Sequence, residues 1–283
     1  MTSRDELQRA TRQIEALLDS APAAELRKHA RAALEYYLRA GEELAQRAKV
    51  DGDELIAFWL YADATGNLLL RIGQYKMAIE LHSQALENIE RSVGPNNIWS
   101  IQVSQHLAVG YFNVRDYARS RELNSAAAEA ANSTLGAHHR ETLKARLSLA
   151  GDYFMLRELD RAIALCEETL GIMEWALGAT DTDTLLARSN LASAYGEAGR
   201  QADQARLLVS TLRILEVEFG EDHPDTIRAR FNLARSYREL GRYDDARELA
   251  SAALAASVRI YGQQHSFTEA VRALLELLDR DSG

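Results

Sequence analysis

Six glycines recur at one constant interval along the chain. The interval is 42 residues, and the glycines are Gly52, Gly94, Gly136, Gly178, Gly220 and Gly262. A fixed period of this size is typical of repeat proteins, in which each repeat is a structural unit that stacks on its neighbours. We therefore expect the 283 residues to form one elongated array rather than one or two compact domains.

Each period contains two segments whose apolar residues have helical spacing, so the chain is expected to be all-α. A content of only 3 prolines agrees, since proline interrupts helices. The repeat domain is placed at 52–264, with repeats at 52–93, 94–135, 136–177, 178–219 and 220–261. In the last four repeats the first helix should begin after Asn97, His139, Asp181 and His223, because Asn and Asp are good N-cap residues.

Further helices are expected on both sides of the repeats. The segments 3–19 and 23–49 follow the repeat pattern poorly and are interpreted as an N-terminal helical cap within 1–51. Residues 265–280 should form a C-terminal capping helix within 265–283. Stacked arrays need such caps for solubility. An alternative for the N-terminal helices is a dimerisation or partner-docking element.

Composition excludes several classes of protein. The net charge of −9 argues against a general binder of nucleic acids or of anionic membranes. A single cysteine rules out an intrachain disulfide and a cysteine-based metal site. No apolar run approaches the roughly 20 residues needed to cross a bilayer, and the N-terminus lacks the apolar core of a signal peptide. We expect a cytoplasmic protein, and the Ala/Arg/Leu/Glu bias favours a bacterial source.

The repeats resemble the tetratricopeptide repeat. Its signature spacing is matched by Leu233-Ala234, Tyr237, Ala246, Ala250 and Ala253, and the period of 42 looks like the kinesin-light-chain type. The pattern is weakest in the first repeat, where Thr65-Gly66 and Leu69 replace Leu-Ala and Tyr. The resemblance implies a right-handed superhelical solenoid of antiparallel helix pairs. It also implies a concave groove, lined by the first helices, where family members bind extended peptides or partner helices.

Helical spacing from the core positions then assigns residues to this groove. They are Gln105 and His106 in the second repeat, Lys144 in the third, Ser189 and Asn190 in the fourth, and Arg228, Phe231, Asn232, Arg235 and Arg238 in the fifth.

Two features of this set indicate a ligand. Asn190 and Asn232 stand where peptide-binding family members carry an asparagine that bonds the ligand backbone; the alternative is a surface amide bonded to a neighbouring repeat. Three arginines lie on one helix of an acidic protein, and guanidinium groups grip carboxylates at two points. The alternative for these arginines is ion pairing with Glu197 and Glu239.

A second set of arginines, Arg146, Arg188 and Arg230, recurs at 42-residue intervals. We interpret it as a structural ladder, bonded to acidic residues such as Glu141 or Asp183, rather than a ligand site.

No catalytic motif is present: the sequence has no HExxH, phosphate-binding glycine loop or nucleophile elbow, and its 7 histidines are scattered. We expect no metal, no cofactor and no enzymatic activity. The leading hypothesis is a scaffold that binds an acidic segment or the C-terminal carboxylate of a protein or peptide. Alternatives are a peptide-responsive bacterial regulator, or an accessory subunit of an enzyme or signalling ATPase encoded on another chain. Self-association as a homo-oligomer stays open.

Overall fold

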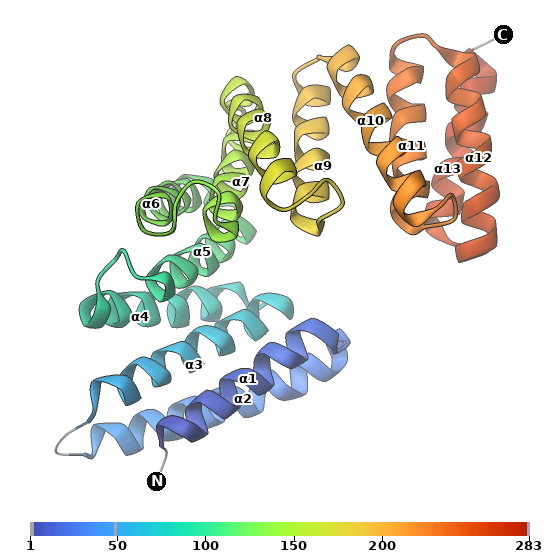
Figure 1. The fold of residues 1–283 in the computed structure, drawn as a ribbon. Coiled ribbons are helices and arrows are strands. Elements are labelled where there is room, and N and C mark those ends of the chain that lie inside the picture. Colours follow the sequence, from blue (N-terminus) through green and yellow to red (C-terminus); the bar gives the residue numbers. More distant parts are fainter. Residues whose placement is uncertain (1–2, 48–49, 282–283) are drawn as a thin grey trace. The chain divides into compact units, whose positions relative to one another are not determined.

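The computed structural model describes residues 3–47 and 50–281. Over these residues the regular structure is thirteen α-helices, without a strand (Figure 1). The helices are α1 (Arg4–Ser20), α2 (Ala23–Ala45), α3 (Gly52–Arg71), α4 (Tyr75–Val93), α5 (Ile98–Asn113), α6 (Tyr117–Leu135), α7 (Arg140–Met155), α8 (Leu159–Ala176), α9 (Thr182–Glu197), α10 (Gln201–Phe219), α11 (Pro224–Glu239), α12 (Tyr243–Tyr261) and α13 (Ser266–Asp281).

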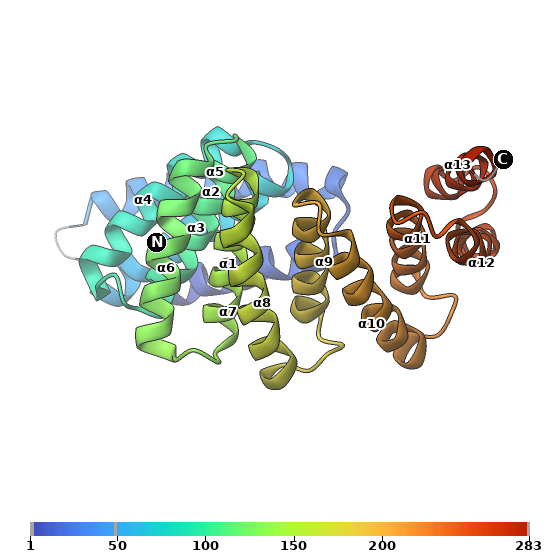
Figure 2. The same ribbon diagram turned by 90° about the horizontal axis from the view of Figure 1, so that it is seen from above.

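The chain divides into two compact units, an N-terminal unit of Met1–Leu156 and a C-terminal unit of Arg157–Gly283. Within each unit, helices that follow one another along the chain pack together in antiparallel pairs, as Figures 1 and 2 show. This confirms the predicted all-α helical-repeat fold. No helix among the described residues is long and apolar enough to cross a membrane.

Side-chain caps set the start of the first helix in four successive pairs. Asn97, His139, Asp181 and His223 each accept a hydrogen bond from the backbone N–H two residues further on. Such a bond satisfies one of the N–H groups that have no partner inside a helix. The four predicted N-caps are thereby confirmed.

The turns inside the pairs need a left-handed residue. Three of them use glycine there, and Gly241, for example, has φ of 71°. The other two use Arg115 and Arg157, with φ of 64° and 65°. A side chain in this conformation costs free energy that glycine avoids.

Gly52 does not share the conformation of the other five glycines that mark the period. It is the first residue of α3, after the N-cap Asp51, whereas Gly94 and its later equivalents lie in loops with positive φ. The start of α3 is therefore built differently from the starts of α5, α7, α9 and α11.

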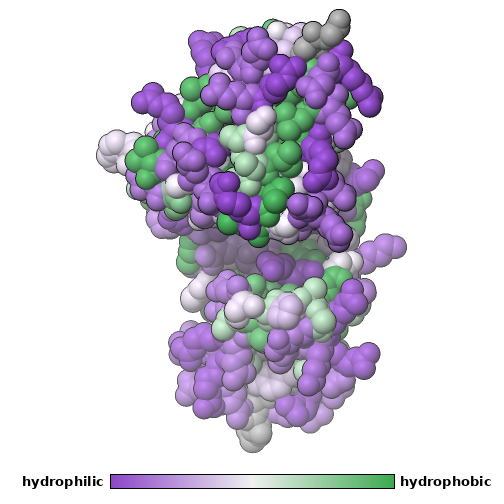
Figure 3. Space-filling model, turned by 90° about the vertical axis from the view of Figure 1, so that its right-hand side faces the viewer, coloured by the Kyte–Doolittle hydropathy of each residue, from purple (hydrophilic) through white to green (hydrophobic). Residues whose placement is uncertain are grey.

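The end helices pack directly on the first and last pairs. In the N-terminal unit α1 and α2 both lie against α3, where Leu7, Leu26 and Phe58 are buried in one core. In the C-terminal unit α13 packs on α12 and α11, and the three helices lie side by side in Figures 1 and 2. Leu278 of α13 is fully buried in the core that it shares with Ala246 and Ala250. On the face of this unit at the top of Figure 3, hydrophilic side chains surround narrower strips of apolar ones.

Candidate ligand-binding groove

The C-terminal unit contains a groove of about 1050 Å³ lined by α9, α10 and α11, here called the α9–α11 groove. Its floor is apolar and includes Leu208 of α10 and Ala229 of α11, both buried. Four predicted site residues line it: Ser189, Arg228, Asn232 and Arg235. The helical spacing of positions 228, 232 and 235 explains this, because these positions share one face of α11.

Asn232 and Arg235 are two polar groups in the groove that have bonding capacity to spare. Among the described residues, the Asn232 amide has no hydrogen-bond partner and Arg235 has no carboxylate within ion-pair distance. The exposed Arg235 guanidinium lies 5.9 Å from the centre of the Phe231 ring. Arg228, by contrast, forms an ion pair with Asp225. The groove therefore offers one free amide and one free cation, three residues apart on one helix face.

The other arginine in the groove has a structural role. Arg188 is buried, with 8% of its side chain exposed, and it lies 2.5 Å from Glu174 of α8. Its equivalent Arg230 is equally buried and lies 2.6 Å from Glu216 of α10. Ion pairing was predicted for these positions, but the partners are glutamates of the preceding helix rather than Glu141 or Asp183. Both arginines reach back to the last helix of the previous pair, and Arg230 also lies 3.8 Å from Glu221, which precedes the start of α11.

Three predicted residues of the C-terminal unit lie outside the groove lining. Asn190 is half-buried on α9 and does not contribute to the cavity. Phe231 packs on Phe267 of α13, with ring centres 5.4 Å apart, and Arg238 is bonded to Asp281 of α13 at 2.6 Å. The final helix therefore engages the C-terminal half of α11, which sequence spacing alone assigned to the groove.

The predicted residues of the N-terminal unit form polar contacts within that unit. The Gln105 side chain donates to the carbonyl of Glu141 over 3.3 Å, and Lys144 lies 3.3 Å from the Glu141 carboxylate. His106 turns toward α3 instead. Its Nδ1 lies 3.0 Å from both carboxylate oxygens of Asp63 and 3.2 Å from the amide nitrogen of Asn67.

A second histidine meets the same carboxylate. His82 of α4 is completely buried, and its Nδ1 lies 2.8 Å from Asp63 Oδ1. Asp63, His82 and His106 thus form one cluster, here called the Asp63 cluster, contributed by α3, α4 and α5. These two histidines are 24 residues apart in the sequence and belong to no ligand motif, so sequence reasoning missed the cluster.

The charges of the Asp63 cluster are coupled. Burial by itself raises the pKa of Asp63, but the charge of His106 and hydrogen bonds from both imidazoles outweigh burial and lower it below its usual value. Burial likewise lowers the pKa of His106, and the charge and hydrogen bond of Asp63 reverse this, so that the pKa is raised. The carboxylate is therefore held in its ionised form by the imidazoles around it.

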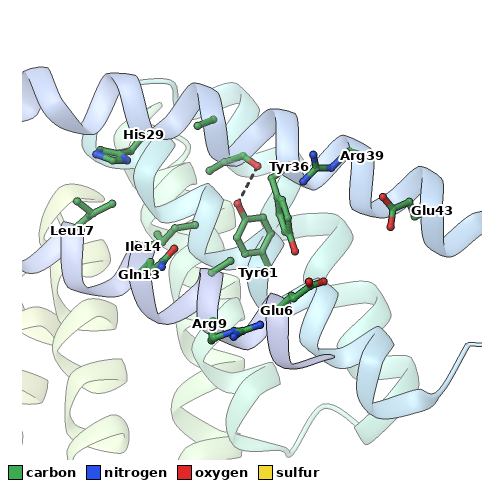
Figure 4. Close-up of a pocket in the computed structure, with 13 residues that line it drawn as sticks. Glu6, Arg9, Gln13, Ile14, Leu17, His29, Tyr36, Arg39, Glu43 and Tyr61 are labelled. Carbon is green, nitrogen blue, oxygen red and sulfur yellow. Dashed lines mark hydrogen bonds between the residues drawn. The ribbon is translucent and has the colours of Figure 1, made fainter. Parts of the chain in front are cut away.

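A smaller cavity of about 740 Å³ lies in the N-terminal unit between α1 and α2 (Figure 4). Tyr61 of α3 forms part of its wall and donates a hydrogen bond to the carbonyl of Ala33. Glu6, Arg9, Arg39 and Glu43 surround the opening with two charges of each sign. Because the two positive and two negative charges balance, the cavity favours neither anionic nor cationic ligands.

Comparison of the sequence with family models matches tetratricopeptide-repeat models to residues 206–257 and 184–225. These two stretches contain α10, α11 and most of α9 and α12, and with them most of the α9–α11 groove. Comparison with curated proteins found no match.

Solved structures share the fold at low sequence identity. One is a kinesin light chain with TPR-like repeats from Podosopora anserina, with 22% identity, a TM-score of 0.66, and coverage of 71% of this chain and 95% of that one. BtubC (BKLC) from P. vanneervenii has 16% identity and a TM-score of 0.70, with 85% and 94% coverage. NprR in complex with its cognate peptide NprX has 13% identity and a TM-score of 0.56, with 99% and 79% coverage. Residues 184–257 thus match tetratricopeptide-repeat models, and the fold of the chain is similar to that of the kinesin light chain repeats.

Proposed function

We propose that this protein is a non-enzymatic scaffold that binds an extended peptide segment of a partner in the α9–α11 groove. The observation that carries the proposal is the pair of free polar groups, Asn232 and Arg235, on the wall of a groove of about 1050 Å³. A peptide-binding role is in keeping with the fold, since the similar NprR structure holds its cognate peptide.

The two groups suit different parts of a peptide. An amide both donates and accepts, so Asn232 can pair with a backbone N–H and C=O of an extended chain. The planar guanidinium of Arg235 matches a carboxylate in a two-point contact. We therefore propose that the ligand carries an acidic side chain or a free C-terminus about one turn of α11 from the backbone bonded by Asn232. The groove also holds Glu197 and Glu239, which disfavour a strongly acidic tract and favour a single carboxylate.

The test is selection of peptides from a random library with free C-termini, followed by affinity measurement on single variants. Arg235→Ala should weaken binding of the selected peptides roughly 10- to 100-fold, because hydrogen bonds to charged groups contribute about 1.5–3 kcal/mol. Asn232→Ala should weaken it roughly 2- to 10-fold for each backbone bond lost, because neutral hydrogen bonds contribute about 0.5–1.5 kcal/mol. Arg213→Ala, which removes an exposed arginine of α10 outside the groove, and Asn190→Ala are the matched controls. Equal affinity of the selected peptides for all four variants would contradict the groove assignment.

C-terminal amidation of the selected peptides separates the two sources of carboxylate. Loss of binding on amidation identifies a C-terminal carboxylate as the group held by Arg235. Unchanged binding that is then lost when an Asp or Glu of the peptide is replaced identifies an acidic side chain.

A second function, a peptide-responsive bacterial regulator acting in the cytoplasm, is favoured by the likeness to NprR with its bound peptide. Under this function a selected peptide should reduce the radius of gyration in solution scattering. A scaffold that merely holds its partner predicts no such compaction.

A further inference from the structure

The Asp63 cluster coincides with a departure from the repeat pattern. Gly66 stands at the place that alanine occupies in the four later helix pairs, Ala108, Ala150, Ala192 and Ala234. A Cβ at Gly66 would lie 2.5 Å from Cε1 and 2.7 Å from Nε2 of His82. The alanine is therefore replaced by glycine at the place where the imidazole ring enters.

The histidine positions are equally specific to this part of the chain. The residues 42, 84, 126 and 168 positions after His82 are Asn124, Cys166, Leu208 and Ala250. His106 stands in the register of Asn190 and Asn232, and no other residue of that register is a histidine. The general packing of helix pairs does not require this set of side chains, because the other pairs form without it.

The donor atoms converge. One ring nitrogen of His82, one ring nitrogen of His106 and an oxygen of Asp63 all lie within 4.8 Å of one another. In both rings Nδ1 is the nitrogen that lies 2.8–3.0 Å from Asp63. A tetrahedral ion with bonds of about 2.0–2.1 Å holds its ligand atoms roughly 3.3 Å apart. The observed separations of 2.8 and 3.0 Å from the carboxylate would need to open by about 0.3–0.5 Å, a small side-chain movement. Nε2 of His82 lies against Gly66, so Nδ1 is the nitrogen that this ring presents to the other two ligands.

From this geometry we propose that Asp63, His82 and His106 are the ligands of a divalent first-row transition metal ion, with Zn²⁺ as the best fit. Two imidazoles and one carboxylate suit zinc and its neighbours, whereas Mg²⁺ and Ca²⁺ prefer oxygen ligands alone. A carboxylate with 11% of its surface exposed also gains a full counter-charge from the ion.

The proposed site has an entrance and room for a fourth ligand. The His106 side chain is 38% exposed, so an ion reaches the cluster from the solvent side of α5. Asn67 of α3 lies 3.2 Å from His106 Nδ1, and either its amide oxygen or a water completes the coordination. By joining α3, α4 and α5, the metal links the first helix pair to the next.

The test is calorimetric titration of chelator-treated full-length protein with Zn²⁺, with Mg²⁺ as the control ion. We expect one equivalent of Zn²⁺ to bind and to raise the thermal midpoint, and Mg²⁺ to do neither. Co²⁺ should give the visible absorption bands of a tetrahedral nitrogen–oxygen site. Absence of Zn²⁺ binding in the micromolar range, or Co²⁺ bands of a hexahydrated ion, would overturn the proposal.

The ligands are tested by His106→Asn and Asp63→Asn. The first keeps the fold, because asparagine stands in this register at positions 190 and 232. Removing even a residue that supports a metal ligand weakens binding about 10- to 100-fold, so each variant should weaken Zn²⁺ by at least this factor. His29→Ala, which removes a histidine of α2 outside the cluster, should bind as wild type. Unchanged Zn²⁺ affinity in His106→Asn would show that the ion sits elsewhere and would refute the site.

Discussion

The substitution Gly66→Ala should have opposite effects on the free energy of unfolding in the wild type and in a His82→Ala background. In Gly66→Ala the new Cβ lies 2.5 Å from the His82 ring, which must move about 0.9 Å to reach the 3.4 Å of ordinary contact. The ring is fully buried and bonded to Asp63, so it cannot move freely. Overpacking of this kind costs about 1–3 kcal/mol, and a disturbed hydrogen bond to a charged group about 1.5–3 kcal/mol.

The intrinsic preference of helices acts in the other direction. Alanine stabilises a helix interior by about 1 kcal/mol relative to glycine. We therefore expect Gly66→Ala to lower the free energy of unfolding by about 1.5–5 kcal/mol in the wild type. In a His82→Ala background, where the obstructing ring is gone, the same change should raise it by about 0.5–1 kcal/mol.

The assay is urea unfolding followed by far-UV circular dichroism, with a chelator present so that no metal contributes. Gly151→Ala in α7 is the matched control, because no atom lies within 4 Å of its added Cβ. It should stabilise both backgrounds alike. A Gly66→Ala variant that is as stable as Gly151→Ala in the wild type would refute the steric account of the cluster.

Four further substitutions test other parts of the fold. Arg115→Gly should raise the thermal midpoint by the equivalent of about 0.5–1 kcal/mol, because the residue has φ of 64° and three equivalent turns use glycine. Arg230→Ala should cost about 1–3 kcal/mol in urea unfolding and Arg228→Ala less than about 0.5 kcal/mol, since 8% of the first side chain and 65% of the second are exposed. Burial raises the pKa of Asp152 above its ordinary 3.8, so the folded state binds its proton more tightly and stability falls as pH rises through that window. Asp152→Asn should therefore be more stable than wild type at pH 7, and the difference should vanish as the pH of the unfolding experiment falls below about 4.

The repeat fold was predictable because its signals are local. A cap such as Asp181 bonds a backbone N–H two residues away, and a turn such as that at Gly241 is determined by one dihedral angle. Each signal recurs at 42-residue intervals, so the copies support one another. The starts of α5, α7, α9 and α11 followed directly from these positions.

The groove residues were only partly predictable, because they depend on what covers each helix. Spacing placed Arg235 and Arg238 on related faces of α11, but α13 bonds Arg238 through Asp281 while Arg235 stays exposed. The docking of a terminal helix is a tertiary contact that no periodic pattern encodes. The Asp63 cluster was not predicted for a related reason. Its members come from three helices, and their contact depends on the glycine at position 66.

The two buried ion pairs bear on how such a chain can grow in evolution. Arg188 bonds the glutamate that precedes it by 14 residues, and Arg230 does the same. A tandem copy of residues 178–219 would bring its own arginine to Glu216 and its own glutamate to Arg230, at the same spacing. Duplication of one period would thus lengthen the array and leave each buried arginine with a glutamate. An insertion between Glu216 and Arg230 that is not a whole number of periods would separate that pair.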